Sequence, residues 1–306
     1  MELIKPGTNI DFVGNMRIFL YISASLVILS ILYLILIGGP RLGIDFAGGT
    51  SVQVKFNQAT TVEKIRDALK SINMESSIIQ QVGAKSDNEF LLRTEISTSD
   101  LKGLQDKIEG ALAAAYGKGG FEMRKVEVVG PKAGKDLRQK GLLALSLALL
   151  GMLVYITWRY EFRYALGGIV ALIHDVIITV GVFALLGREF TLTVIAAILT
   201  IIGYSINDTI VIFDRIRENV KKNPRQNLGE VMNFSINQTL SRTILTSFTV
   251  FLVVISLYLF GGSVINDFAF ILLVGVVVGT YSSIFIASQL VLVWESFRPS
   301  KKARKK

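Results

Sequence analysis

The sequence contains no cysteine and a single histidine, His174. Without cysteine there are no disulfides, thiol nucleophiles, iron–sulfur clusters or cysteine zinc sites. One histidine is too few for a histidine-rich metal centre. No nucleophile–base pair or phosphate-binding loop stands out either, so we expect no metal, no cofactor and no enzymatic activity.

Acidic residues are outnumbered by basic ones, 24 against 33, and the net charge is +9. In a soluble protein this balance would suggest a nucleic-acid partner. Here the basic residues lie in short segments between or after apolar runs, which is the positive-inside pattern of membrane proteins. The charge therefore favours membrane lipid as the surroundings and predicts no nucleic-acid partner.

Long apolar runs account for much of the chain, which is 51% hydrophobic with a mean hydropathy of +0.51. A helix needs about 20 apolar residues to cross the hydrocarbon core. The first run exceeds the roughly 7–15 apolar residues of a signal peptide and no A-x-A-like cleavage site follows it, so we expect it to remain uncleaved. We expect six transmembrane helices, over residues 18–37, 142–158, 165–186, 192–213, 244–260 and 268–294.

Residues 41–138 have mixed charge and no long apolar run. Period-two alternation predicts strands over 50–56, 76–82, 88–93 and 121–129. Helical spacing predicts helices over 61–72, capped by Thr60 or Thr61, and over 99–116, capped by Ser99 or Asp100. The resulting order β-α-β-β-α-β is the ferredoxin-like pattern. The expected fold is an all-α membrane protein with this α+β domain inserted between its first and second helices.

The basic segments also predict an orientation. With the N-terminus inside, residues 159–164, 214–242 and the tail fall on the cytoplasmic side of the membrane, and all carry an excess of Lys and Arg. The predicted organisation is a cytoplasmic N-terminus at 1–16, helix one at 17–38, an extracytoplasmic domain at 39–138, helices two to six at 139–295 and a basic cytoplasmic tail at 296–306.

The fourth expected span carries an aspartate, Asp208, between Asn207 and Thr209. An ionisable residue inside a span costs about 2.5–3.5 kcal/mol on insertion scales and is a functional hypothesis by default. The alternative is an interfacial aspartate near the helix end. Helical spacing places several side chains on one face, which we expect to turn away from lipid: Thr200, Tyr204, Asn207, Asp208 and Val211.

Arg242 opens the fifth span and is followed by Thr243, Thr246 and Thr249 at helical spacing. Taken alone, the arginine is a positive-inside flank. Beside Asp208, it would form an ion pair that favours the charged carboxylate, and its movement would let the aspartate bind a proton. The two residues together predict a proton switch.

Two further features have a functional and a packing interpretation. His174 and Asp175 lie within the third span, where they would form a proton relay or hydrogen-bond across helices. On the sixth span, small residues at intervals of four predict close helix packing, within the chain or against a partner subunit: Gly275, Gly279, Ser283 and Ala287. The glycines of residues 43–50 precede a strand and are interpreted as a tight turn at the membrane exit.

At this point the motifs match a known family. The plan of one helix, a large outer domain and five helices resembles a half-unit of the RND superfamily, and within it the SecF family of the bacterial Sec export system. The matching segments are residues 43–50, 129–131, 158–163, 174–175, 203–209, 213–215, 217–219 and 241–243.

The resemblance implies an auxiliary subunit that acts with SecD at the SecYEG channel, together with YajC and YidC, on unfolded preprotein late in export. It implies that the proton motive force drives this step and that Asp208 and Arg242 take part in proton passage. Two other hypotheses stay open: another RND-type proton-coupled transporter of lipids or small molecules, and a membrane scaffold without transport. The outer domain is smaller than those of such transporters, which argues against the transporter hypothesis. The scaffold hypothesis does not explain why Asp208 lies within a span.

Overall fold

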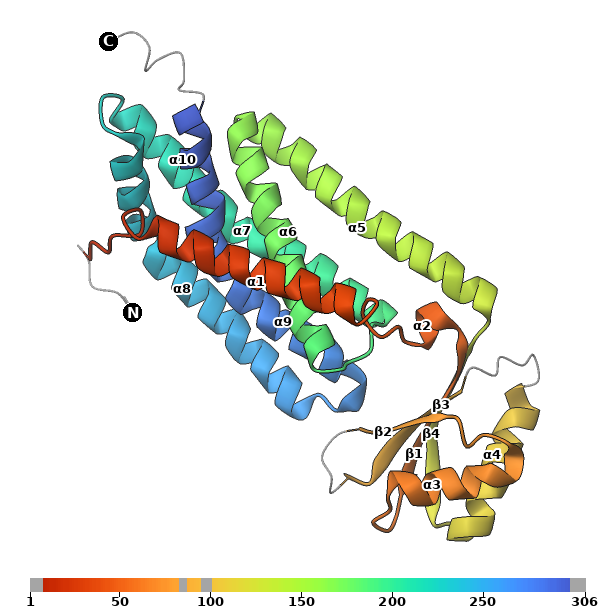
Figure 1. Cartoon of the computed structure of the whole chain (residues 1–306). Helices are drawn as coiled ribbons and strands as arrows, with labels where there is room; N and C mark the ends of the chain where they lie inside the picture. Colours follow the sequence, from red (N-terminus) through yellow and green to blue (C-terminus); the bar gives the residue numbers. More distant parts are fainter. Residues whose placement is uncertain (1–7, 83–86, 95–100, 298–306) are drawn as a thin grey trace. The chain divides into compact units, whose positions relative to one another are not determined.

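The computed structural model describes residues 8–82, 87–94 and 101–297 (Figure 1). The chain forms two compact units. We call the first the sheet unit; it comprises Leu42–Leu143 together with Glu189–Leu192. The rest of the chain forms the helix unit: Met1–Arg41, Ala144–Arg188 and Thr193–Lys306.

The sheet unit contains four antiparallel strands in the order β2-β3-β1-β4. The strands are β1 (Gly49–Phe56), β2 (Ile78–Val82), β3 (Glu89–Thr94) and β4 (Phe121–Val129). The helices are α2 (Ile44–Ala47), α3 (Val62–Leu69) with a 3-10 turn at Lys70–Ile72, and α4 (Leu101–Tyr116). From β1 to β4 the strands and helices follow one another in the predicted order. Thr61 caps α3 by accepting a hydrogen bond from the Lys64 amide. The predicted caps of α4, Ser99 and Asp100, lie outside the described residues.

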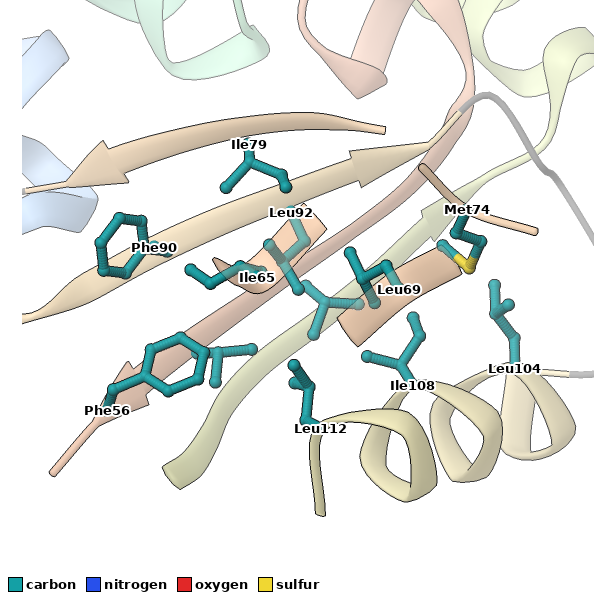
Figure 2. Packing of buried hydrophobic residues seen from close by; sticks show 12 residues of the cluster. Phe56, Ile65, Leu69, Met74, Ile79, Phe90, Leu92, Leu104, Ile108 and Leu112 are labelled. Atoms are coloured by element: carbon teal, nitrogen blue, oxygen red, sulfur yellow. The ribbon is translucent and has the colours of Figure 1, made fainter. Parts of the chain in front are cut away.

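Alternating side chains of β1 make the core of this unit. Val52, Val54 and Phe56 are at most 2% exposed and pack against α3 and α4. Figure 2 shows Ile65 and Leu69 of α3 and the α4 side chains directed at the same face of the sheet. The amphipathic spacing of both helices explains this contact, because it gives each helix one apolar face that packs against the sheet.

The helix unit is built from helices long and apolar enough to cross a membrane; within the described ranges there are six. They are α1 (Met16–Leu36), α5 (Pro131–Arg159), α6 (Phe162–Leu185), α7 (Leu192–Lys222), α8 (Leu228–Phe260) and the run from α9 (Ser263–Ser282) through a π-helical turn (Ser283–Ala287) to α10 (Ser288–Phe297). Leu147, Leu150 and Val154 of α5 are exposed, as lipid-facing side chains would be. The six expected spans are all present.

Two stretches are more helical than the hydropathy pattern indicates. Of the polar residues 214–242, residues 214–222 extend α7 and residues 228–242 begin α8, with 223–227 as the connection. Glu218 pairs with Arg215 and Lys222 on α7, and the Asn227 side chain caps α8 by accepting a hydrogen bond from the Gly229 amide. Helix α5 begins at Pro131, so the expected boundary at 138/139 falls inside a helix. Proline is favoured at the first position of a helix, and an apolar count cannot detect a polar first turn. Of the expected basic tail, residues 298–306 lie outside the described part of the chain.

Candidate functional site

Asp208 lies inside the helix unit, on α7, and is only 2% exposed. The Ser247 hydroxyl of α8 donates a hydrogen bond to Asp208 Oδ2 at 3.2 Å. The Thr280 hydroxyl of α9 in turn donates to Ser247 Oγ at 2.8 Å. Three helices therefore contribute to one chain of hydrogen bonds that ends on a buried carboxylate.

Tyr204 precedes Asp208 by one helical turn. Its hydroxyl is buried beside Ser247 and Thr280 but makes no hydrogen bond of normal geometry with any described residue. A buried hydroxyl without a partner is costly and is usually satisfied by water or by a rearrangement of its neighbours. The surroundings of Asp208 thus hold an unused hydrogen-bonding group within the same hydroxyl cluster.

The structure does not bring Arg242 into direct contact with Asp208. Arg242 is exposed on α8, and no salt bridge joins the two among the described residues, although their charges interact at longer range. Thr243 and Ser247 form the buried face of α8, and Arg242 lies off that face. The expected ion pair is therefore not formed in this conformation.

The predicted polar face of α7 divides into two sides. Asp208 and Thr209 are buried, and the Thr209 hydroxyl lies 2.8 Å from Ser283 Oγ. Thr200 and Asn207 are exposed on this chain. Successive residues of a helix differ in direction by about 100°, so neighbours such as 207 and 208 face different surroundings. Thr200 and Asn207 therefore do not face this chain's own bundle.

A second buried carboxylate, Asp175 of α6, is fully buried. His174 Nδ1 lies 2.9 Å from Asp175 Oδ1. Asp175 Oδ2 accepts hydrogen bonds from Ser205 of α7 at 2.6 Å and from Ser282 of α9 at 2.8 Å. The carboxylate thus ties three helices together, an arrangement that favours the packing interpretation of this pair.

Sequence reasoning missed the hydroxyl donors of both carboxylates. Ser205 lies one helical turn before Asp208 on α7, yet its hydroxyl donates to Asp175 of α6, which helical spacing does not predict. Ser247, Thr280 and Ser282 come from other helices, and one sequence does not tell which faces of two helices meet. Their place in the site depends on the tertiary packing.

The small residues of α9 pack within this chain. A Cβ atom at Gly279 would lie 2.9 Å from Ser205 Cβ, and one at Gly275 would overlap Ile201. Ser283 continues the stripe with its hydroxyl contact to Thr209. The stripe therefore lets α9 approach α7, and its glycines are not a free face for another subunit.

No group of three or more His, Cys, Asp or Glu side chains suited to a metal ion occurs in the part of the chain that the structure describes. Two buried carboxylates of the bundle, Asp208 and Asp175, are instead each hydrogen-bonded to hydroxyls. An ionisable group held inside a membrane is costly and is a functional hypothesis by default.

Comparisons with known proteins place this arrangement in a family. A family profile described as "Protein export membrane protein SecD/SecF, C-terminal" matches residues 109–296, and one described as "SecD/SecF GG Motif" matches residues 33–60. "Protein translocase subunit SecF" of Calditerrivibrio nitroreducens is 47% identical over 97% of this chain and 98% of its own length. The protein of the same name from Magnetococcus marinus is 45% identical, over 96% of this chain and 95% of its own.

Solved structures agree with these relatives. The crystal structure of SecDF from Thermus thermophilus, described as a translocon-associated membrane protein, superposes with a TM-score of 0.82 at 36% identity. It is matched over 95% of this chain, which spans 39% of that longer one. SecDF in its super-membrane-facing form superposes with a TM-score of 0.70. The chain belongs to the SecF family of protein translocase subunits.

Proposed function

We propose that this protein is an auxiliary subunit of the Sec export machinery that acts with SecD at the SecYEG channel and uses the proton motive force to drive late translocation of unfolded preprotein. The relatives named as translocase subunits and the likeness to SecDF support the export role. YajC and YidC are further proposed partners. The proton-driven part of the proposal depends on the bundle itself.

The observation that carries the proton role is the burial of Asp208. A carboxylate that is 2% exposed and hydrogen-bonded to Ser247 is held inside a helix bundle that fits a membrane. Keeping such a group in the bundle is costly unless it serves the function. Asp208 is therefore the proposed proton-binding group, with Asn207 and Thr209 beside it and Arg242 as a cation that approaches it in another conformation.

The proposed partner also accounts for the exposed side of α7. Thr200 and Asn207 are polar and face away from this chain's own bundle. A polar helix side is unfavourable against lipid, so a second membrane half would cover it. Because this chain spans 39% of the solved SecDF chain, SecD is the proposed source of that half and of the remaining groups of a proton path.

We further propose that the α+β domain at 39–138 is an extracytoplasmic ferredoxin-like domain and that both termini, 1–16 and 296–306, are cytoplasmic. The strand order β2-β3-β1-β4 with two helices on one face supports the fold assignment. The basic residues of the α7–α8 hairpin and of 298–306 support the orientation. The His174–Asp175 pair is proposed to pack helices, with a relay as the alternative.

The test is preprotein export into vesicles that contain this chain, SecD and SecYEG, with and without a proton gradient. Asp208→Asn should remove the stimulation by the gradient while the complex still assembles. Asp214→Asn, on the same helix but half-exposed and paired with Arg159, is the matched control and should export normally. Undiminished stimulation with Asp208→Asn would refute the proton role, and failure to copurify with SecD would favour another RND-type transporter.

A further inference from the structure

The run from α9 to α10 is interrupted by the π-helical turn Ser283–Ala287 (Figure 1). Such a turn holds one residue more than an α-helical turn, and π-helical turns inside α-helices are frequent at functional sites. The Ser288 hydroxyl donates a hydrogen bond to the Ser283 carbonyl at 3.1 Å, across the turn. The turn divides one membrane-spanning helix into two segments, each with its own contacts.

The segment before the turn reaches both buried carboxylates. The Thr280 hydroxyl donates to Ser247, which is the donor to Asp208. The Ser282 hydroxyl donates to Asp175 Oδ2 at 2.8 Å. Helix α9 therefore carries a hydroxyl for each of the two carboxylate clusters, and any rotation of α9 moves both hydroxyls together.

The segment after the turn is fixed to the start of α6. Glu295 of α10 forms an ion pair with Arg163 at 2.5 Å, and the ring centroid of Trp294 lies 6.1 Å from that of Phe162. The side chains of the ion pair are largely buried, at 14% exposed for Arg163 and 20% for Glu295. The contacts that fix α10 are thus separate from those through which α9 reaches the carboxylates.

The surroundings of the turn leave it room to change. A Cβ atom at Gly167 of α6 would lie 2.7 Å from the Ala287 carbonyl oxygen, so α6 presents no side chain at this position. Gln289, two residues beyond the turn, is 2% exposed, and neither polar atom of its side chain has a partner among the described residues. A buried amide without partners is costly, and this cost lowers the stability of the present register of the helix.

Conversion of the π-helical turn into an α-helical one would move α9 by one residue relative to α10. In an α-helix, one residue corresponds to a rotation of about 100° and a rise of about 1.5 Å. Helix shifts of about 1–2 Å are among the transitions by which proteins switch between states. A rotation of this size would withdraw Thr280 from Ser247 and Ser282 from Asp175 in one movement.

We propose that Thr280 and Ser282 are positioning residues for the two carboxylates, and that α9 rotates about the π-helical turn while α10 stays fixed to α6. Hydrogen bonds to an ionised carboxylate are roughly twice as strong as those between neutral groups. A charged Asp208 therefore holds α9 in the present register through Ser247, and a protonated Asp208 releases it. The buried Tyr204 hydroxyl, which has no partner among the described residues, is placed to replace Thr280 beside Ser247. The proposal rests on the proton role proposed above for Asp208.

The experiment measures distances between spin labels in the complex of this chain with SecD. The sequence contains no cysteine, so each introduced pair of cysteines is labelled at defined positions. Ile173→Cys on α6 with Val277→Cys on α9 follows α9, and Val170→Cys on α6 with Phe297→Cys follows α10; all four positions are exposed on this chain. Asp208→Asn, which removes the charge, should shift the α9 distance and leave the α10 distance unchanged.

Thr280→Val tests the link between α9 and Asp208. Valine keeps the shape of threonine but removes the hydroxyl, so the α9 distance should take its shifted value whether residue 208 is Asp or Asn. Thr249→Val is the control, because Thr249 is exposed on α8 and donates only to its own backbone at Thr246. It should leave the response to Asp208→Asn intact.

Two further variants test the turn itself. Deletion of Ala287 removes the additional residue, so the α9 distance should no longer respond to Asp208→Asn and gradient-stimulated export should fall about fivefold or more. Ser288→Ala keeps the length but removes the hydrogen bond to Ser283, so the shifted α9 distance should appear even with Asp208 in place. Ser296→Ala is exposed on α10, bonds only to its own backbone and should change neither readout.

An α9 distance that ignores Asp208→Asn would overturn the proposal, and so would equal shifts of both distances, because they indicate rigid movement of the whole helix. Normal gradient-stimulated export after deletion of Ala287 would also overturn it. If that deletion prevents assembly, Ser288→Ala decides, and the absence of a shifted distance overturns the proposal. Unchanged proton flux with Asp208→Asn would instead refute the proton role, so the two failures are distinguishable.

Discussion

Ser247 is the one side chain seen to donate a hydrogen bond to Asp208 among the described residues, and it also accepts one from Thr280. Ser247→Ala removes both bonds and leaves a buried acceptor short of a donor, which costs about 1–3 kcal/mol. We expect a lower thermal midpoint and weaker gradient-dependent export. Ser256→Ala is the control, because Ser256 is exposed on the same helix and bonds only to its own backbone at Leu252. Equal effects of the two substitutions would contradict the role of Ser247.

Asp175 tests whether the His174–Asp175 pair packs helices or relays protons. Asparagine keeps a carbonyl oxygen for the Ser205 and Ser282 hydroxyls, so Asp175→Asn should retain both assembly and proton flux. Asp175→Leu removes all acceptors and should destabilise the subunit by about 1–3 kcal/mol, measured as a lower denaturation midpoint in detergent. If Asp175→Asn assembles normally but abolishes flux, the relay interpretation replaces the packing one.

Among the elements, the contact between α7 and α9 depends on a missing side chain. A methyl group at Gly279 would lie 2.9 Å from Ser205 Cβ and 3.0 Å from its Oγ, and Ser205 holds Asp175. Gly279→Ala should therefore cost about 1–3 kcal/mol through overpacking. Gly151→Ala on α5 meets nothing within 4 Å and, by helix propensity, should leave stability unchanged or slightly raised. The comparison is made on thermal midpoints, and equal midpoints for the two variants would refute the close contact.

Two neighbouring isoleucines of β2 lie on opposite faces of the sheet, and replacing each of them tests which face is buried. Ile79 is 9% exposed and belongs to the core, whereas Ile78 is 59% exposed. Ile79→Ala should destabilise the sheet unit by about 2–5 kcal/mol, and Ile78→Ala by much less. Faster hydrogen exchange at the β2 and β3 amides of Ile79→Ala, but not of Ile78→Ala, is the expected observation. The reverse order would mean that the register of β2 is wrong.

The same elements show how far periodicity predicts the fold. Strand β4 was expected and observed at 121–129, because alternation with period two depends on the faces of a single strand. The start of α5 at Pro131 and the helical ends of α7 and α8 were not indicated by hydropathy, which counts apolar residues. These stretches combine polar and buried apolar residues: proline opens α5, Glu218 forms ion pairs on α7, and Met232 is buried on α8.

At the scale of the whole molecule, the sequence was sufficient to select Asp208 and Asp175 but not their partners. A charged residue within an apolar run can be identified from the sequence alone, because the cost of placing it in the membrane does not depend on which helix lies beside it. Ser247, Ser282 and Thr280 are polar residues like many others until the packing brings them to a carboxylate. The positions of Asp208 and Arg242 along the chain predict that they pair directly. The pair is not formed because the packing of the helices decides which side of α8 faces Asp208.

Asp208 is proposed to carry protons through the bundle and so to drive export. The most direct measurement is proton flux across vesicles that contain the complex of this chain with SecD and SecYEG, driven by an imposed gradient during preprotein export. We expect Asp208→Asn, in a complex assembled to the normal extent, to reduce flux to that of vesicles without the complex, whereas Asp214→Asn should leave it unchanged. Flux through the Asp208→Asn complex equal to that of the unsubstituted complex would contradict the proton role of Asp208.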